Sequence, residues 1–327
     1  MRFLHVALLA TVALPVVAAL PHRTGASDEW MARHSMSARP VVLLVHGRGY
    51  LHRDSAEFRR EALQALRQGA FNAANDSLLG DDDVRIVWYA DLLDSRRQNA
   101  ASVLACGAAE SKQSPSSVLG VMALLASALL DANAAGEAAD DMHGLAGDLR
   151  FLGDPDTRCS AEKRLADALA RAGDEGRPVV LVAHSLGALV SWGHLKQRGA
   201  AAEQRLSEIR RLVTVGSPLG SDDLRQLLLL PGDRVGPVTL PQKVRSWVNV
   251  VNEDDPFAAR LAGASAADAA THARTGIADV MTQRLPGDPH ELRGYLRDPA
   301  SARAVLGAWC EAFESRDRGA GCGRMLR

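Results

Sequence analysis

Continuous apolar runs, each ended by polar or glycine residues, predict the buried strands of a sheet. The first run, Val41–Val45, is rich in β-branched residues, which is typical of a strand buried on both faces of a parallel sheet. Four later segments complete the set of predicted strands: Val84–Tyr89, Val179–Ala183, Leu212–Val215 and Val244–Val251.

Segments with helical periodicity alternate with these strands. Asp54 is followed three positions later by Glu57, a capping-box spacing, and apolar residues then recur at helical intervals until Gly69. Further helices are predicted at Leu186–Lys196 and Ala300–Phe313. Strands that alternate with helices predict an α/β fold with a mostly parallel, doubly wound sheet covered by helices on both faces.

One connection is much longer than the others. Residues 95–175 are alanine-rich and helical by propensity, and they exceed an ordinary connection between a strand and a helix. We therefore expect a helical insertion between the early strands and the strand at Val179–Ala183. Its segment Val118–Leu130 is apolar enough to cover a hydrophobic pocket as a lid, or to pack on the sheet as an ordinary amphipathic helix.

The N-terminus has the pattern of a secretory signal peptide. Arg2 precedes an apolar run that reaches residue 20 and contains the small residues Val17-Ala18-Ala19 near its end. The pattern predicts an exported protein, periplasmic or secreted, from which residues 1–19 are cleaved after Ala19. Two alternatives stay open: an uncleaved membrane anchor, and a cytosolic protein that starts at Met31 or Met36.

The remaining chain is predicted to form a flexible lead-in over 20–39, an α/β domain over 40–315 and a tail over 316–327. A chain of 327 residues with 47% hydrophobic and 24% charged residues can bury a sizeable core. The net charge of −1 gives no basic excess, which argues against a nucleic-acid partner. No apolar run beyond residue 20 is long enough to span a bilayer.

The four cysteines form an even set, as expected of a protein with two disulfides in an oxidising compartment. Sequence permits three pairings, and we predict Cys106–Cys159 and Cys310–Cys322, which each close a local segment. The alternative is four unpaired, mostly buried thiols. No pair has the Cys-x-x-Cys spacing of zinc or thioredoxin-type sites, so no metal is predicted.

An abrupt change from strand to helix surrounds one serine. The strand Val179–Ala183 runs into His184-Ser185-Leu186-Gly187, and helical spacing begins at once. A serine at such a tight turn exposes its hydroxyl at the end of the sheet beside a helix N-terminus, where negative charge is stabilised. The alternative is a turn serine that caps the helix.

The pentapeptide Ala183-His184-Ser185-Leu186-Gly187 resembles the nucleophile elbow Gly-x-Ser-x-Gly of the α/β-hydrolase superfamily, with Ala183 in the first glycine position. The resemblance implies that Ser185 is a nucleophile. It also implies that the segment His46-Gly47-Arg48-Gly49, after the first strand, forms half of an oxyanion hole, with the amides of Arg48 and Leu186 as donors. His46 is expected to hold this loop rather than to carry protons.

In this superfamily an acidic residue and then a histidine follow the serine in the chain. Asp255 ends the acidic stretch after the strand Val244–Val251 and is the predicted triad acid, because its Asp-Pro-apolar context resembles the acid loop of lipases and esterases. Glu253 and Asp254 are its nearest competitors, and Asp222 is a more distant one.

Two histidines follow Asp255. His290 lies in a turn-rich loop, from which a side chain can bend over the nucleophile, and it is the predicted base. His272 lies in an alanine-rich helical segment and is the alternative. His184 is expected to line the site or to pack. The Gly-Ser-Pro sequence at 216–218 also resembles lipase-like members of the superfamily and is expected to wall the pocket.

These residues predict an exported serine hydrolase of the lipase or esterase type, which cleaves a carboxylic ester through an acyl-enzyme without a cofactor or metal. The predicted partner is a small-molecule or lipid ester, and a lipid substrate would bring the protein to a membrane surface. Two alternatives stay open: an acyltransferase that uses the same triad, and a non-catalytic binding protein on the hydrolase fold.

Overall fold

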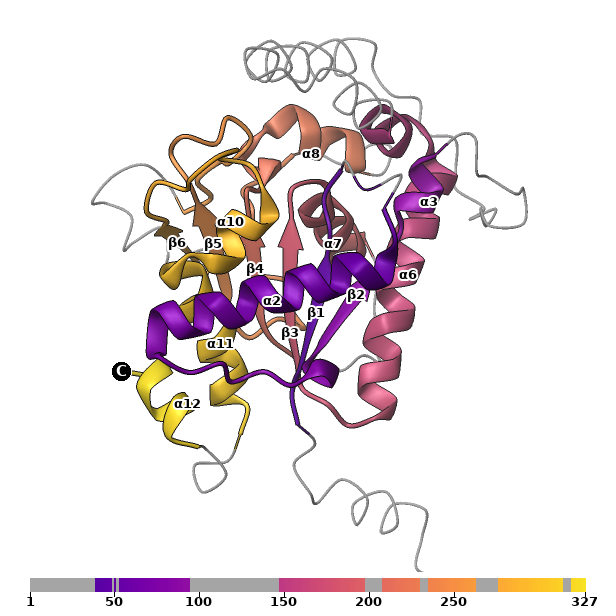
Figure 1. The fold of residues 1–327 in the computed structure, drawn as a ribbon. Helices are drawn as coiled ribbons and strands as arrows, with labels where there is room; N and C mark the ends of the chain where they lie inside the picture. Colours follow the sequence, from indigo (N-terminus) through magenta and orange to yellow (C-terminus); the bar gives the residue numbers. More distant parts are fainter. Residues whose placement is uncertain are drawn as a thin grey trace, which may run out of the picture. The chain divides into compact units, whose positions relative to one another are not determined.

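A six-stranded, all-parallel sheet forms the centre of the molecule (Figure 1). The computed structural model describes residues 39–48, 50, 53–94, 147–197, 208–229, 235–262, 276–313 and 319–327. The strands run in the order β2-β1-β3-β4-β5-β6. Their bounds are β1 Val41–Val45, β2 Val84–Val87, β3 Val179–His184, β4 Ile209–Val215, β5 Trp247–Val251 and β6 Ile277–Met281.

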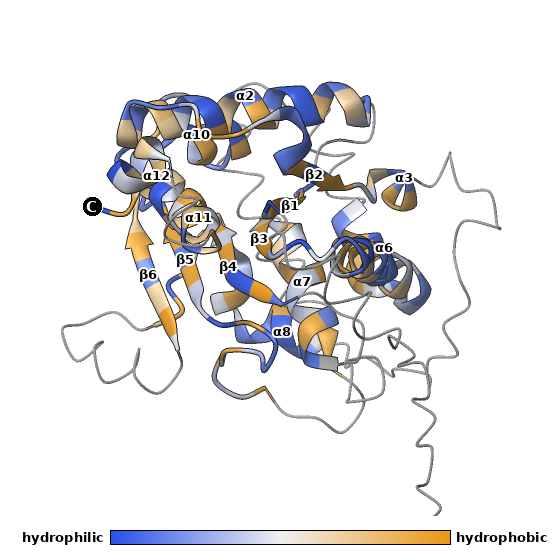
Figure 2. Ribbon diagram, turned by 90° about the horizontal axis from the view of Figure 1, so that it is seen from below, coloured by the Kyte–Doolittle hydropathy of each residue, from blue (hydrophilic) through white to orange (hydrophobic). Residues whose placement is uncertain are grey.

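Helices cover both faces of this sheet, which confirms the predicted α/β class. Figure 2 shows α2, α10, α11 and α12 on one side of the strands and α6, α7 and α8 on the other. The helices are α2 Ser55–Ala74, α3 Ala90–Leu93, α6 Pro155–Asp174, α7 Leu186–Gln197, α8 Asp222–Leu228, α10 Leu292–Arg297, α11 Pro299–Glu311 and α12 Ala320–Met325, with short 3₁₀ turns η1 Asp81–Asp83 and η3 Pro218–Gly220.

The central strands bury side chains on both faces, which explains their continuous apolar sequences. Successive residues of a strand point to opposite faces of the sheet. In β1, Val42 and Leu44 accordingly join the core beneath α2 and α11, whereas Val41, Leu43 and Val45 join the core beneath α6 and α7. Every residue of β1 and β3 is buried.

The end of α2 differs from the prediction. Asp54 caps the helix, because its side chain accepts hydrogen bonds from the backbone of residues 56 and 57. The helix does not stop at Gly69 but continues to Ala74. Gly69 lies where α2 packs against the end of α10, and a Cβ at this position would lie 2.2 Å from the carbonyl oxygen of Leu296. Close helix packing, rather than helix termination, therefore requires this glycine.

Strand β6 was not among the predicted strands, because Asp279 interrupts its apolar pattern. The carboxylate of Asp279 accepts hydrogen bonds from the Asn249 side chain at 2.8 Å and from the backbone N–H of Ala262 at 2.9 Å. Asn249 and Asp279 are paired in the β5–β6 register. A polar residue in this strand thus ties the loop after β5 to the sheet.

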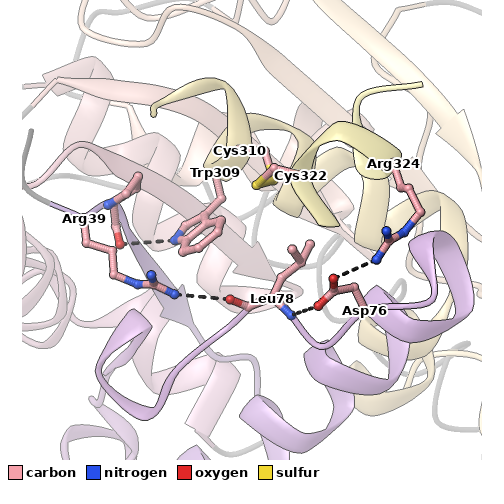
Figure 3. The surroundings of a disulfide bond; sticks show 8 residues. Arg39, Asp76, Leu78, Trp309, Cys310, Cys322 and Arg324 are labelled. Atoms are coloured by element: carbon pink, nitrogen blue, oxygen red, sulfur yellow. Dashed lines mark hydrogen bonds and ion pairs between the residues drawn. A yellow bond between two sulfur atoms is a disulfide. The ribbon is translucent and has the colours of Figure 1, made fainter. Parts of the chain in front are cut away.

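The disulfide Cys310–Cys322 joins α11 to α12 and confirms one predicted pairing. Near this disulfide, Arg324 of α12 donates a hydrogen bond to Asp76, in the turn after α2, at 2.8 Å (Figure 3). The pairing Cys106–Cys159 includes a residue outside the described part of the chain.

Several other predictions also fall outside the described residues. They are the signal peptide over 1–19, most of the lead-in, residues 95–146 of the insertion with Val118–Leu130, and the segment around His272. The described part of the insertion, 147–175, is helical over 147–153 and in α6. In the part of the chain that the structure describes, no helix has both the length and the apolar character needed to cross a bilayer.

Removal of the disulfide should destabilise the fold. The bond closes a loop of 12 residues, and its loss in the double variant C310A/C322A should lower the free energy of unfolding by about 2–4 kcal/mol, measured by urea denaturation. Each single variant should lose as much as the double, because either substitution breaks the same bond. If the stability losses of the two single variants instead sum to that of the double variant, the bond itself is not stabilising and the losses come from packing alone.

Candidate active site

The predicted site residues follow the ends of four parallel strands of the sheet, β1, β3, β5 and β6. Parallel strands present all their carboxyl ends at one edge of a sheet, where the loops that follow them meet. His46 follows β1, Ser185 follows β3, and Asp255 lies in the loop after β5. The loop after β6 carries His290 to the same edge.

Ser185 occupies a sharp turn between β3 and α7. Its φ of 53° lies in the left-handed region, which costs a non-glycine residue about 1–3 kcal/mol. Its backbone N–H donates to the carbonyl of Val215 at 3.2 Å, so pairing with β4 extends into the turn. Gly187 lets α7 approach β1, because a Cβ there would lie 2.4 Å from the carbonyl oxygen of Val45.

A chain of hydrogen bonds joins three predicted residues. His290 Nε2 lies 2.8 Å from Ser185 Oγ, and His290 Nδ1 lies 2.8 and 2.9 Å from the two carboxylate oxygens of Asp255. A carboxylate only accepts, so Nδ1 carries the proton and Nε2 is left to accept from the serine hydroxyl. Residues more than a hundred positions apart in the chain thus form one linear arrangement.

Asp255 is held as a buried carboxylate. Besides His290, the hydroxyl of Tyr295 donates to it at 2.6 Å and the backbone N–H of Phe257 donates at 2.8 Å. Burial alone would raise the pKa of Asp255. The hydrogen bond and charge of His290 and the hydrogen bond of Tyr295 lower it by more, so the pKa of Asp255 lies below its ordinary value. Burial, and then the same carboxylate, raises the pKa of Tyr295.

The competing acids lie elsewhere. Glu253 pairs with Arg260 at 3.1 Å, and Asp254 pairs with Arg284 at 3.0 Å with nearly half of its side chain exposed. Asp222 is the first residue of α8 and pairs with Arg225. None of these three carboxylates contacts Ser185 or His290 within the described residues.

His46 holds the loop after β1. Its Nε2 accepts from the backbone N–H of Tyr89 at 3.2 Å, so its Nδ1 carries the proton and donates to the carbonyl of Gly47 at 2.7 Å. The hydroxyl of Tyr89 donates back to the His46 carbonyl at 2.6 Å, and the two rings stack at 4.2 Å. Burial lowers the pKa of His46 to about 4, which keeps the imidazole neutral.

Arg48 connects this loop to His290 through an aromatic ring. Its guanidinium lies 4.6 Å from the centre of the Phe257 ring, and that ring lies 4.6 Å from the ring of His290. Arg48 also pairs with Asp148 at 3.3 Å. Burial raises the pKa of Asp148 to about 6 despite the opposing charge of Arg48.

The two expected oxyanion donors flank the nucleophile. Leu186 is the first residue of α7, and Arg48 follows Gly47 on the loop after β1. Within the described residues, neither backbone N–H donates to a loop carbonyl or to a side chain. Within that part of the chain, both amides are thus left without an acceptor, as an oxyanion hole beside Ser185 would require.

No family model, curated protein or solved structure matches this chain. The function must therefore be argued from the residues of the site. Over the described ranges, no group of three or more His, Cys, Asp or Glu side chains is arranged to hold a metal ion.

Sequence reasoning missed several residues that support the site. The side chain of Asn252 donates to the Pro289 carbonyl at 3.1 Å. In the sequence, only its position at the end of a strand could have indicated this role. Phe257 was noted as the apolar residue after Asp-Pro but not as a ring against His290. Asp148 lies in the helical insertion, where no sequence pattern distinguishes it from other acids.

His46 should make the fold sensitive to acid. The unfolded chain protonates this histidine near its ordinary pKa of 6.5, whereas the folded protein keeps it neutral down to about pH 4. The unfolded state binds more protons between these values, so the free energy of unfolding falls as the pH falls through this window.

The variant His46→Asn tests this, since its amide can still donate to the Gly47 carbonyl. Between about pH 6 and pH 5 its stability should fall by about 1 kcal/mol less than that of the wild type, measured by urea denaturation at each pH. Comparing slopes removes any constant cost of the substitution. Equal slopes in the two proteins would contradict a buried neutral imidazole.

Proposed function

We propose that this protein is an exported serine hydrolase of the α/β-hydrolase superfamily, which cleaves a carboxylic ester through an acyl-enzyme. The hydrogen-bond chain from Ser185 through His290 to Asp255 carries the proposal. The all-parallel sheet, the strained serine at a strand-to-helix turn and the order of the three residues in the chain support the superfamily.

In the first half of the reaction Ser185 Oγ attacks the ester carbonyl carbon while His290 Nε2 takes the hydroxyl proton. The 2.8 Å contact between these two atoms is the geometry that this transfer needs. Asp255 fixes the proton on Nδ1 and stabilises the imidazolium that forms. The carbonyl oxygen becomes an oxyanion, to which the amides of Arg48 and Leu186 donate.

The tetrahedral intermediate collapses when His290 returns the proton to the leaving alcohol, which leaves the acyl group on Ser185. Water then attacks the acyl-enzyme, with His290 again as the base, and the carboxylic acid is released. The ring of Phe257 packs against the base and restricts its motion, and the guanidinium of Arg48 packs against the Phe257 ring. The Cys310–Cys322 disulfide supports export, because disulfides persist in oxidising compartments.

Ser185→Ala should abolish turnover of a p-nitrophenyl ester and labelling by a fluorophosphonate probe, because both require the hydroxyl nucleophile. Ser191→Ala is the matched control, a serine that is also buried, lies on α7 and bonds the Gly187 carbonyl at 2.8 Å. It should keep both activities. If the wild type resists the probe, or if Ser185→Ala still turns over the ester, the proposed mechanism is wrong.

The choice of acid is tested by two adjacent substitutions. Asp255→Asn removes the charge that holds the proton on His290 Nδ1 and should lower kcat on the order of 10⁴-fold. Asp254→Asn, at the neighbouring exposed carboxylate, should change kcat by no more than about twofold. Steady-state hydrolysis of the same p-nitrophenyl ester measures both values. A similar loss in the two variants would show that Asp255 has no special role.

A further inference from the structure

His184, next to the nucleophile in the chain, has no part in the proton transfers, yet it is buried beside the base. It is the last residue of β3 and only 4% exposed. Its ring lies 4.9 Å from the ring of His290, measured between centroids. A buried polar ring at this position needs a physical role.

The imidazole of His184 holds the backbone of the base. Its Nε2 lies 2.9 Å from the carbonyl oxygen of His290. A carbonyl only accepts, so Nε2 carries the proton and donates it to this hydrogen bond. The other ring nitrogen, Nδ1, makes no hydrogen bond within the described residues. The bond to His290 is therefore the only hydrogen bond that this side chain makes there.

A second side chain holds the preceding carbonyl. Asn252, directly after β5, donates to the carbonyl of Pro289 at 3.1 Å. In the described residues no backbone N–H donates to the carbonyl of either Pro289 or His290. Side chains from two different strand ends thus replace the backbone hydrogen bonds that a helix or strand would have supplied to this loop.

We propose that His184 is a positioning residue, which through its hydrogen bond to the His290 carbonyl holds the base at the distance and angle that Ser185 requires. The inference rests on the proposed function. The backbone of His290 is fixed from β3, the same strand that presents the nucleophile, so any shift of the elbow moves both reacting groups together.

The charge state of His184 suits this role. Burial, and then the neighbouring His290, lowers the pKa of His184 to about 3. Asp255 and Phe257 face His290, Arg48 lies beyond Phe257, and the Tyr295 ring lies 6.2 Å from the ring of His184. His184 therefore stays neutral when His290 becomes positively charged during the reaction, and it adds no repulsion.

Two substitutions separate the hydrogen bond from the volume of the ring. His184→Phe fills the space without a donor, whereas His184→Gln places an amide N–H near the position of Nε2. His194→Phe is the matched control, because His194 is a buried histidine about 12 Å along α7 from its first residue, Leu186. Thermal unfolding of each variant checks that it is folded at the assay temperature.

For p-nitrophenyl acetate we expect His184→Phe to lower kcat on the order of 10²-fold with little change in KM, because a misplaced base affects the reaction more than binding. His184→Gln should recover kcat to within about fivefold of the wild type. His194→Phe should behave as the wild type. A folded His184→Phe with normal kcat, or equal losses in the Phe and Gln variants, would overturn the proposal.

A measurement without turnover distinguishes this proposal from failure of the proposed function. The Nδ1 proton of His290, bonded to Asp255, should give a far-downfield NMR signal in the wild type, in His184→Gln and in His194→Phe. His184→Phe should lose or broaden this signal. A wild type that keeps the signal but resists the fluorophosphonate probe would refute the hydrolase. A signal unchanged in His184→Phe would refute the positioning role alone.

Discussion

The parallel, in-register pairing of β1, β3, β4 and β5 is the constraint on which the site depends. Val45 is paired with Ala183, His184 with Val215, and Val215 with Val250, so these strands end within one residue or so of each other. A slip of one residue would exchange the faces on which side chains are buried, so the core on both faces fixes this register. The same packing that stabilises the sheet therefore aligns the loops that carry His46, Ser185 and Asp255.

Burial of charge is the second constraint. Asp255 is removed from water and stays ionised only because His290, Tyr295 and a backbone N–H donate to it. An ionised group buried without such partners would be costly. The donors come from the loop after β5, from the loop after β6 and from α10, so the carboxylate holds these three segments together. The same hydrogen bonds to Asp255 therefore keep the carboxylate ionised and fix the conformation of the loops around it.

The sequence predicted the parts of the fold that local physics determines. Val41–Val45 was found to the residue because a doubly buried strand is continuously apolar, and the turn at Ser185 was found because strand and helix patterns meet there. Tertiary contacts decided the rest. The role of Gly69 depends on Leu296, β6 carries a polar residue bonded to Asn249, and the choice of Asp255 over its two acidic neighbours depends on which carboxylate faces His290.

Two histidines lie near Ser185, and the one next to it in the chain is not the one that contacts its hydroxyl. Ser185 turns out of β3 with a left-handed φ, so its hydroxyl and the His184 ring reach different atoms of the same distant residue. Ser185 meets the side chain of His290, and His184 meets its carbonyl. His290 is bonded at its carbonyl by the last residue of β3 and at its side chain by the residue that follows, so it cannot move away from Ser185 without breaking a hydrogen bond. In the proposed mechanism the neighbour of the serine therefore acts by positioning the base, and the distant histidine acts by transferring protons.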